Sequence, residues 1–283
     1  MILIETDFSL THPDGLKVSC TIRLPSGKQK FNPIIVGHGF RGFKDWGFFP
    51  HLCKCLSNAG FAVISFNHAF SGIRDDPLVI DDIEGFSRNS TTQELLDWYL
   101  VIDSLLWGNC PYLERLRSHA LGIFGHSRGG SYGILLSRQV LQVQSIVTWG
   151  AIKTFDRFDF ETCRKWKREG ILRIGSTEQG QPLELKVTAL EALEKNLEQL
   201  NITQAMRQLS VPALILHGRD DRIVSISEAK QLWQCADHKL SAFHIIEGSG
   251  HTFQTQHPLI NPSLALKEAI DKTTQWFKNT LPH

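Results

Sequence analysis

Six short apolar runs recur along this chain and alternate with longer segments of helical periodicity. In order, the runs are PIIVGHG, FAVISFN, ALGIFG, SIVTWG, PALILHG and FHIIEGSG. Strands that are apolar at nearly every position are typical of parallel sheets buried on both faces. The helical patterns occupy about 49–59, 91–107, 128–140, 226–236 and 263–279. This alternation predicts a mostly parallel sheet that is flanked by helices on both faces.

The first residues follow a different pattern. ILIETDFSL and LKVSCTIRLP alternate apolar and polar residues and are separated by HPDG, so they predict two antiparallel strands joined by a turn. With the six runs, they bring the expected sheet to eight strands. We therefore expect an α/β fold in which residues 1–283 form a single domain.

One segment is too long for an ordinary connection. Between SIVTWGA and VPALILHG lie roughly sixty residues, whereas most connections in compact domains are much shorter. Within LELKVTALEALEKNLEQL, four leucines fall on one face of an expected helix: Leu190, Leu193, Leu197 and Leu200. We expect residues 152–208 to form a helical cap, or lid, inserted within the domain and placed over a functional site.

Charge and hydropathy exclude several classes of protein. The chain has 30 basic and 29 acidic residues, and a net charge of +1 gives no electrostatic reason to expect nucleic acid or an anionic membrane as a partner. MILIETDFSL lacks the basic and apolar regions of a secretory signal, and no apolar run is long enough to cross a membrane. We therefore expect a cytoplasmic protein.

The sequence also lacks the motifs that would indicate a metal ion or a nucleotide cofactor. Of the six cysteines only Cys53 and Cys55 are close together, and no second pair stands at zinc-ligand spacing. The glycine-rich segments match neither a phosphate-binding loop nor a dinucleotide-binding loop. We expect no metal and no organic cofactor.

The hexapeptide GHSRGG lies where the chain passes from an expected strand to an expected helix. It could be a glycine-rich turn with a helix-capping serine. It also matches G-x-S-x-G over Gly125–Gly129, the pattern that places a nucleophilic serine on a strained turn above a parallel sheet. The strand before the motif and the helix after it favour the second interpretation, and we predict that Ser127 is a nucleophile.

A serine nucleophile needs a base, and the base needs a carboxylate that orients it. In this architecture the acid and then the histidine follow the serine, each just after a strand. GSGHTF follows the last expected strand and supplies His251 as the base. HGRDDRIV follows the preceding strand and supplies two candidate acids, Asp220 and Asp221.

Two backbone N–H groups are expected to hold the oxyanion that forms during acyl transfer. One belongs to Arg128, the residue after the serine. The other is expected from Phe40, in the segment HGFRG after the strand PIIVGHG. Gly39 lets the backbone of this loop come close to a ligand.

Four segments together carry a resemblance to a known family. HGFRG, GHSRGG, HGRDDRIV and GSGHTF resemble, in order and approximate spacing, the motifs of the α/β-hydrolase superfamily from about residue 32 to residue 253. The chain is most similar to small serine esterases and acyl peptidases of the dienelactone-hydrolase-like and feruloyl- or cinnamoyl-esterase-like groups. Dienelactone hydrolases themselves use a cysteine nucleophile, so the serine at 127 means that their lactone chemistry is not implied.

The resemblance implies the α/β-hydrolase fold and acyl transfer without a cofactor. It favours Asp221 as the acid, because HGRDDRIV then matches H-G-x-x-D-x-x-V. The expected function is that of a carboxylesterase-like serine hydrolase acting on a small or medium-sized ester through an acyl-enzyme. Two alternatives stay open: a peptidase or amidase with the same triad, and a binding protein that has kept the fold without the chemistry.

Residues around the site are expected from their place at strand ends and in the cap. Gly39, Trp46, His68 and Trp166 are candidate substrate-pocket residues, although core packing is an equal alternative for Trp46. His38 and His126 are expected to hold loops by hydrogen bonds, and His257 is expected at the surface. The partner is a small-molecule ester. The oligomeric state stays open, with a homodimer as one alternative.

Overall fold

A computed structural model describes residues 2–282. Its main sheet has eight strands in the order β1-β2-β4-β3-β5-β6-β9-β10. β1 pairs with β2, and β2 with β4, in antiparallel fashion, and all the other pairings are parallel. The predicted mostly parallel eight-stranded sheet is therefore confirmed. The strand bounds are β1 (Leu3–Thr11), β2 (Lys17–Pro25), β3 (Pro33–Gly37), β4 (Ala62–Phe66), β5 (Leu121–His126), β6 (Val143–Trp149), β9 (Ala213–Gly218) and β10 (Ser241–Ile246).

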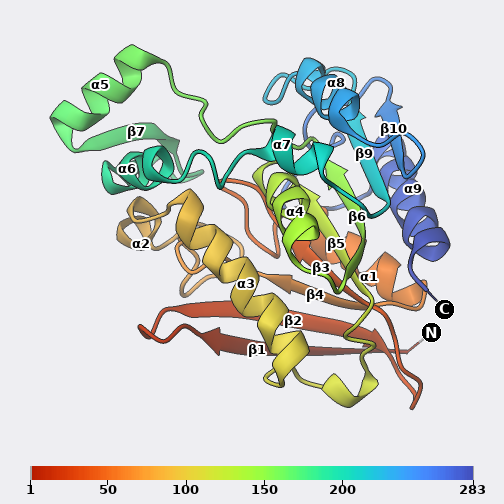
Figure 1. Cartoon of the computed structure of the whole chain (residues 1–283). Coiled ribbons are helices and arrows are strands. Elements are labelled where there is room, and N and C mark those ends of the chain that lie inside the picture. The colour runs from red at the N-terminus through yellow and green to blue at the C-terminus, as the bar shows by residue number, and fades with distance from the viewer. Residues whose placement is uncertain (1, 283) are drawn as a thin grey trace.

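Helices cover both faces of this sheet (Figure 1). The apolar face of α1 and α9 packs on one side against residues such as Ile34, and α3, α4 and α8 pack on the other side against Ile35. Neighbouring residues of a strand point to opposite faces, which explains why the central strands are apolar throughout. The bounds are α1 (Phe49–Asn58), α3 (Thr91–Trp107), α4 (Arg128–Gln139), α8 (Ile226–Cys235) and α9 (Leu264–Thr280), and each lies within one residue of its predicted range.

The segment after β6 has a different architecture from the one expected. It contains α5 (Phe160–Glu169), β7 (Ile171–Ser176), β8 (Pro182–Lys186), α6 (Thr188–Lys195) and α7 (Ile202–Arg207). β7 and β8 form a two-stranded antiparallel sheet of their own. The expected insertion does contain helices, α5, α6 and α7, but the helical stretch expected from residue 183 begins only at Thr188, because residues 182–186 form β8. In β8, Leu183 and Leu185 are buried and Glu184 between them is not, which is the two-residue periodicity of a strand. The leucines that follow in the sequence have helical spacing, and they made the whole stretch look like one helix.

A second part of the chain joins this segment. α2 (Ile83–Ser87) packs on β8, and Phe86 belongs to the same apolar cluster as Trp166, Leu183 and Leu190. Figure 1 shows α5, β7 and α6 together at one end of the molecule, beside α2. Near the other end of α3, a 3₁₀ turn spans Leu113–Arg115. The roof over the sheet is thus built from the loop after β4 as well as from the expected cap at 152–208.

The carboxyl ends of four parallel strands bring the predicted site residues to one edge of the sheet. β3 leads into the loop with Phe40, and its neighbour β5 leads into Ser127. β9 and β10 are also neighbours and lead to Asp221 and His251. Open α/β sheets bind their ligands at this edge.

Candidate active site

Ser127 has a strained backbone at the junction between β5 and α4. Its φ is 55° and its ψ is −123°, a conformation that non-glycine residues rarely adopt. A Cβ on Gly125 would lie 2.3 Å from the carbonyl of Gly129, and a Cβ on Gly129 would lie 2.6 Å from the carbonyl oxygen of Gly37. The turn can therefore form only with glycine on either side of the serine, and it holds the hydroxyl at the N-terminus of α4.

His251 and Asp221 form a hydrogen-bonded pair. Nδ1 of His251 lies 2.6 Å from Oδ2 of Asp221. The other carboxylate oxygen accepts the backbone N–H groups of Ile223 and Val224, each at 2.9 Å. Burial by itself would raise the pKa of Asp221, but these hydrogen bonds and the neighbouring His251 outweigh it and hold that pKa below its usual range. Asp220, the other candidate acid, is exposed.

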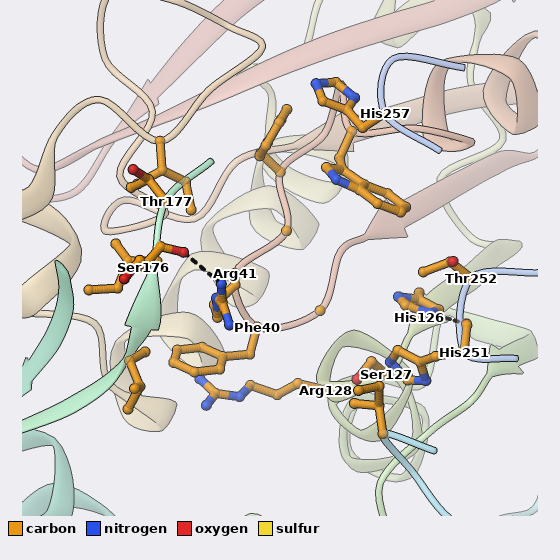
Figure 2. Close-up of a pocket in the computed structure, with 18 of the residues that line it drawn as sticks. Phe40, Arg41, His126, Ser127, Arg128, Ser176, Thr177, His251, Thr252 and His257 are labelled. Carbon is orange, nitrogen blue, oxygen red and sulfur yellow. Dashed lines mark hydrogen bonds between the residues drawn. The ribbon is translucent and has the colours of Figure 1, made fainter. Parts of the chain in front are cut away.

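Ser127 and His251 line the same cavity and lie close together in Figure 2. Across residues 2–282 no protein group forms a hydrogen bond with Ser127 Oγ or with His251 Nε2, and the two atoms form none with each other. Both atoms are therefore available to each other and to a ligand.

The two backbone amides expected to hold an oxyanion also border the cavity. Phe40 and Arg128 both contribute to its lining. A Cβ on Gly39 would lie 2.7 Å from Cβ of Ser127, so the glycine allows the loop after β3 to approach the serine. Among the described residues neither amide has a protein acceptor, and Arg128 is the first residue of α4, where an N–H has no partner within the helix.

The side chain of Arg128 connects these two amide-bearing residues. Its guanidinium lies 4.0 Å from the centre of the Phe40 ring. The same group lies 3.2 Å from Oε1 of Glu94, whose side chain is almost fully buried, and donates to Oδ1 of Asn89 at 3.2 Å. Burial would raise the pKa of Glu94, but Arg128, the nearby His68 and the hydrogen bond from Asn89 lower it to about 2, so the carboxylate is charged.

The cavity has a volume of about 880 Å³ and lies between the sheet edge and the roof. Gly39 and Trp46, two of the candidate pocket residues, are part of its wall. Within the described chain no group of three or more His, Cys, Asp or Glu side chains is placed to hold a metal ion. No helix between residues 2 and 282 has the length and apolarity needed to cross a membrane.

Comparisons with known proteins place this geometry in context. No protein-family model matches the chain. The 2,6-dihydropseudooxynicotine hydrolase of Paenarthrobacter nicotinovorans is 22% identical over 214 residues, which cover 74% of this chain and 50% of that protein. The chain therefore spans about half the length of this curated relative.

Solved structures resemble the chain over nearly its whole length. The esterase domain of a Rhodothermus marinus protein has a TM-score of 0.65 and 19% identity and covers 99% of both chains. Est1E from Butyrivibrio proteoclasticus, with ferulic acid bound, has a TM-score of 0.71 and 16% identity and covers 96% of this chain and 99% of that chain. This chain has the α/β-hydrolase fold. The resemblance inferred from the four motifs is confirmed at the level of the fold.

Within the α/β-hydrolase fold, two of the expected pocket residues lie elsewhere. Trp166 is 2% exposed and donates its Nε1–H to the carbonyl oxygen of Leu185, so it fills the interior of the cap. His68 is also 2% exposed, and its Nδ1 lies 3.2 Å from Asp97 beneath the loop after β3. Neither contributes to the cavity wall, and both expectations are corrected.

His257 lines the cavity, although the sequence suggested only a surface position. Its ring stacks on Trp46 with 6.0 Å between centroids, its Nδ1 accepts the N–H of Gly47 at 2.9 Å, and its Nε2 lies 2.9 Å from the carbonyl oxygen of Leu78. It thereby links its own loop to the segment of Trp46 and Gly47 and to the segment of Leu78. Its position in a long loop without a recognisable motif gave no signal of this.

Two other histidines have the loop-holding contacts that we expected. His126 Nε2 lies 2.9 Å from the carbonyl oxygen of His251, and burial together with the neighbouring His251 lowers the pKa of His126 to about 3. His38 Nδ1 lies 2.8 Å from the carbonyl oxygen of Gly39, and burial together with the nearby His68 lowers its pKa to about 3 as well. Both rings are uncharged at neutral pH, so each donates a single N–H to a carbonyl of a cavity loop.

Proposed function

We propose that this chain is a serine hydrolase that cleaves a carboxylic ester of a small or medium-sized molecule. The observation that carries the proposal is the strained Ser127 beside His251, whose Nδ1 lies 2.6 Å from the buried carboxylate of Asp221. A serine on such a turn, a histidine and an orienting acid are the three groups that nucleophilic acyl transfer needs. The esterase domain and Est1E, which share the fold, support the choice of an ester.

The reaction follows from the positions of these groups. Nε2 of His251 takes the proton from Ser127 as its oxygen attacks the acyl carbon, and Asp221 fixes the tautomer and stabilises the imidazolium. The amides of Phe40 and Arg128 donate to the oxyanion. His251 then returns the proton to the leaving alcohol. Water, activated by the same histidine, releases the acid and frees the serine.

The buried partner of Arg128 adds a positioning role to this scheme. Arg128 and Phe40 carry the two proposed oxyanion donors, and their side chains are in direct cation–π contact. Glu94 forms an ion pair with the same guanidinium. We propose that Glu94 thereby sets the relative position of the two amides, without itself touching the substrate.

Hydrolysis of a matched ester and amide tests the proposed bond type. We expect turnover of a p-nitrophenyl alkanoate with an initial burst of one nitrophenolate per active site, because deacylation is slower than acylation for such activated esters. The matching p-nitroanilide should react far more slowly, since an amine is a poorer leaving group. Equal or faster cleavage of the anilide would identify an amidase or peptidase instead. No turnover of either compound by the folded protein would favour the binding-protein alternative.

A further inference from the structure

Four arginines contribute to the cavity wall: Arg41, Arg128, Arg157 and Arg173. Two of them are ion-paired, Arg128 at 3.2 Å and Arg157 at 2.8 Å from the nearest carboxylate oxygen. Within the described part of the chain, neither Arg41 nor Arg173 has a carboxylate partner. The cavity wall thus carries two exposed guanidinium groups that form no ion pair within this part of the chain.

These two guanidinium groups meet at one residue of the cap. Nη2 of Arg41 donates to the carbonyl oxygen of Ser176 at 3.0 Å (Figure 2), and Nη2 of Arg173 lies 3.5 Å from the hydroxyl oxygen of the same serine. The Arg41 guanidinium also lies against β7 so closely that a Cβ on Gly175 would come within 3.1 Å of it. The glycine therefore leaves room for this side chain. Both arginine side chains are exposed, so they border the open part of the cavity beside Ser176. An anion that binds between two like charges stabilises both of them.

The arginine pair belongs to the same cavity as the proposed nucleophile. Arg41 follows Phe40 directly in the loop after β3, and its backbone has a left-handed φ of 62°. This conformation lets the Phe40 ring reach Arg128 while the Arg41 side chain turns toward the cap. Figure 2 shows the Arg41 guanidinium beside Ser176, at a distance from Ser127 and His251. One molecule can therefore present one group to the serine and another to the arginines.

The charge of the wall indicates the charge of that second group. Among the described residues, one carboxylate lines the cavity, that of Glu178, two residues beyond Ser176. Two unpaired guanidinium groups and one carboxylate leave a local charge of one positive unit. A singly charged group such as a carboxylate balances this charge, whereas a doubly charged phosphate monoester would exceed it next to Glu178.

We propose that the substrate of this site carries a carboxylate apart from the scissile ester, and that Arg41 and Arg173 bind it. A half-ester of a dicarboxylic acid is the simplest compound of this class. The proposal rests on the proposed function for the ester-cleaving end, but the binding of the carboxylate itself does not depend on catalysis. The two can therefore be tested separately.

The first measurement compares kcat/KM for mono-p-nitrophenyl adipate and for the neutral p-nitrophenyl hexanoate. We expect the wild-type protein to favour the charged ester about tenfold or more, since hydrogen bonds to charged groups are strong. Arg41→Gln, Arg173→Gln and the double variant should lose this preference. Arg138→Gln, which removes an exposed charge on α4 outside the cavity, should keep it. A wild-type preference for the neutral ester, or a charged-ester preference that survives in the double variant, would overturn the proposal.

The second measurement uses Ser127→Ala, which cannot form an acyl-enzyme. Calorimetry should show binding of monoethyl adipate, weaker binding of the neutral ethyl adipamate, and loss of the difference in a protein that also carries Arg41→Gln and Arg173→Gln. Equal binding of the two compounds would overturn the carboxylate site even if ester turnover is normal. Selective binding without any turnover by the wild-type protein would support the carboxylate site and refute the proposed hydrolase instead.

Discussion

At the scale of single residues, Asp220 and Asp221 offer a matched pair. They are neighbours with the same charge, but the carboxylate of Asp221 reaches His251, whereas Asp220 is exposed to solvent. We expect Asp221→Asn to lower kcat/KM by about 10⁴-fold, because an amide stabilises the wrong tautomer of the histidine. Asp220→Asn should change it less than about threefold. Steady-state kinetics on one activated ester decide this, and a large loss in both variants would contradict the assignment.

Glu94 gives a second prediction at this scale. Replacing it by glutamine removes the negative charge that pairs with Arg128, whose guanidinium lies against the face of the Phe40 ring. We expect Glu94→Gln to lower kcat about tenfold with little change in KM, because a small displacement of the oxyanion donors acts on the transition state. The same kinetic experiment on Glu247→Gln serves as the control.

That control removes an equivalent charge from an exposed ion pair. Glu247 pairs with Arg219 at the surface, and neither residue lines the cavity. Its kcat and KM should match those of the wild type. If Glu94→Gln raised KM and left kcat unchanged, the proposed positioning role would be wrong.

The residues of the site differ in how far the sequence reveals them. Ser127 and His251 stand in short segments whose flanking strand patterns predict both their position and their neighbours. Glu94 and His257 stand in no such segment. Glu94 meets Arg128 only because α3 and α4 lie on the same face of the sheet, and that contact depends on tertiary packing rather than on local pattern.

At the scale of secondary-structure elements, the turn between β5 and α4 depends on close backbone contacts. A methyl group on Gly129 would lie 2.6 Å from the carbonyl oxygens of Gly37 and His38, which cannot move without disturbing β3 and its loop. We expect Gly129→Ala to reduce the free energy of unfolding by at least about 2 kcal/mol. Urea denaturation measures this.

Gly250 provides the comparison. It lies in the loop before His251, and a methyl group added there comes no closer than 3.8 Å to the nearest atom, the carbonyl oxygen of Asp220. Gly250→Ala should therefore retain nearly the wild-type free energy of unfolding. Equal stability of the two variants would mean that the elbow tolerates a side chain and is not strained by its contacts.

The elements of the main sheet and its helices were predictable because long, periodic patterns specify them. The hairpin β7–β8 was missed for a physical reason. Its strands are short, and β7 is at most half-buried, so its sequence lacks a clear apolar alternation. The leucines of α6 follow β8 after a single residue, and this continuity favoured one long helix.

At the scale of the whole molecule, the cap forms one wall of the cavity at the sheet edge, with Phe155, Phe158 and Leu172 among the lining residues. Trp166 is buried inside the cap and contacts Phe158, whose ring centroid lies 5.3 Å away. We expect Trp166→Ala to loosen the cap, since truncating a buried aromatic side chain costs about 3–5 kcal/mol. The kcat/KM for an ester with a bulky aromatic acyl group should then fall about tenfold more than that for an acetate ester.

The corresponding control is Trp107→Ala. Trp107 is 80% exposed at the end of α3 and should affect neither ester. An equal loss for both esters in Trp166→Ala would show that the cap supports the catalytic residues rather than the bound acyl group.

The apolar periodicity of the sequence predicted the sheet and its flanking helices. It did not predict that the loop after β4 joins the cap above the sheet. Strand order and helix placement are constrained by the rules of parallel α/β sheets. Ile80 and Phe86 pack against the apolar residues of the cap, although they lie about seventy residues or more before it in the sequence. The local sequence pattern around them does not predict this contact.

The central claim is that Ser127 is an activated nucleophile, and labelling with a fluorophosphonate tests it most directly. Intact-protein mass would be measured for the wild type and for Ser127→Ala after the same incubation. The account predicts one adduct on the wild type and none on the variant. An unlabelled but folded wild type, or equal labelling of both proteins, would contradict it.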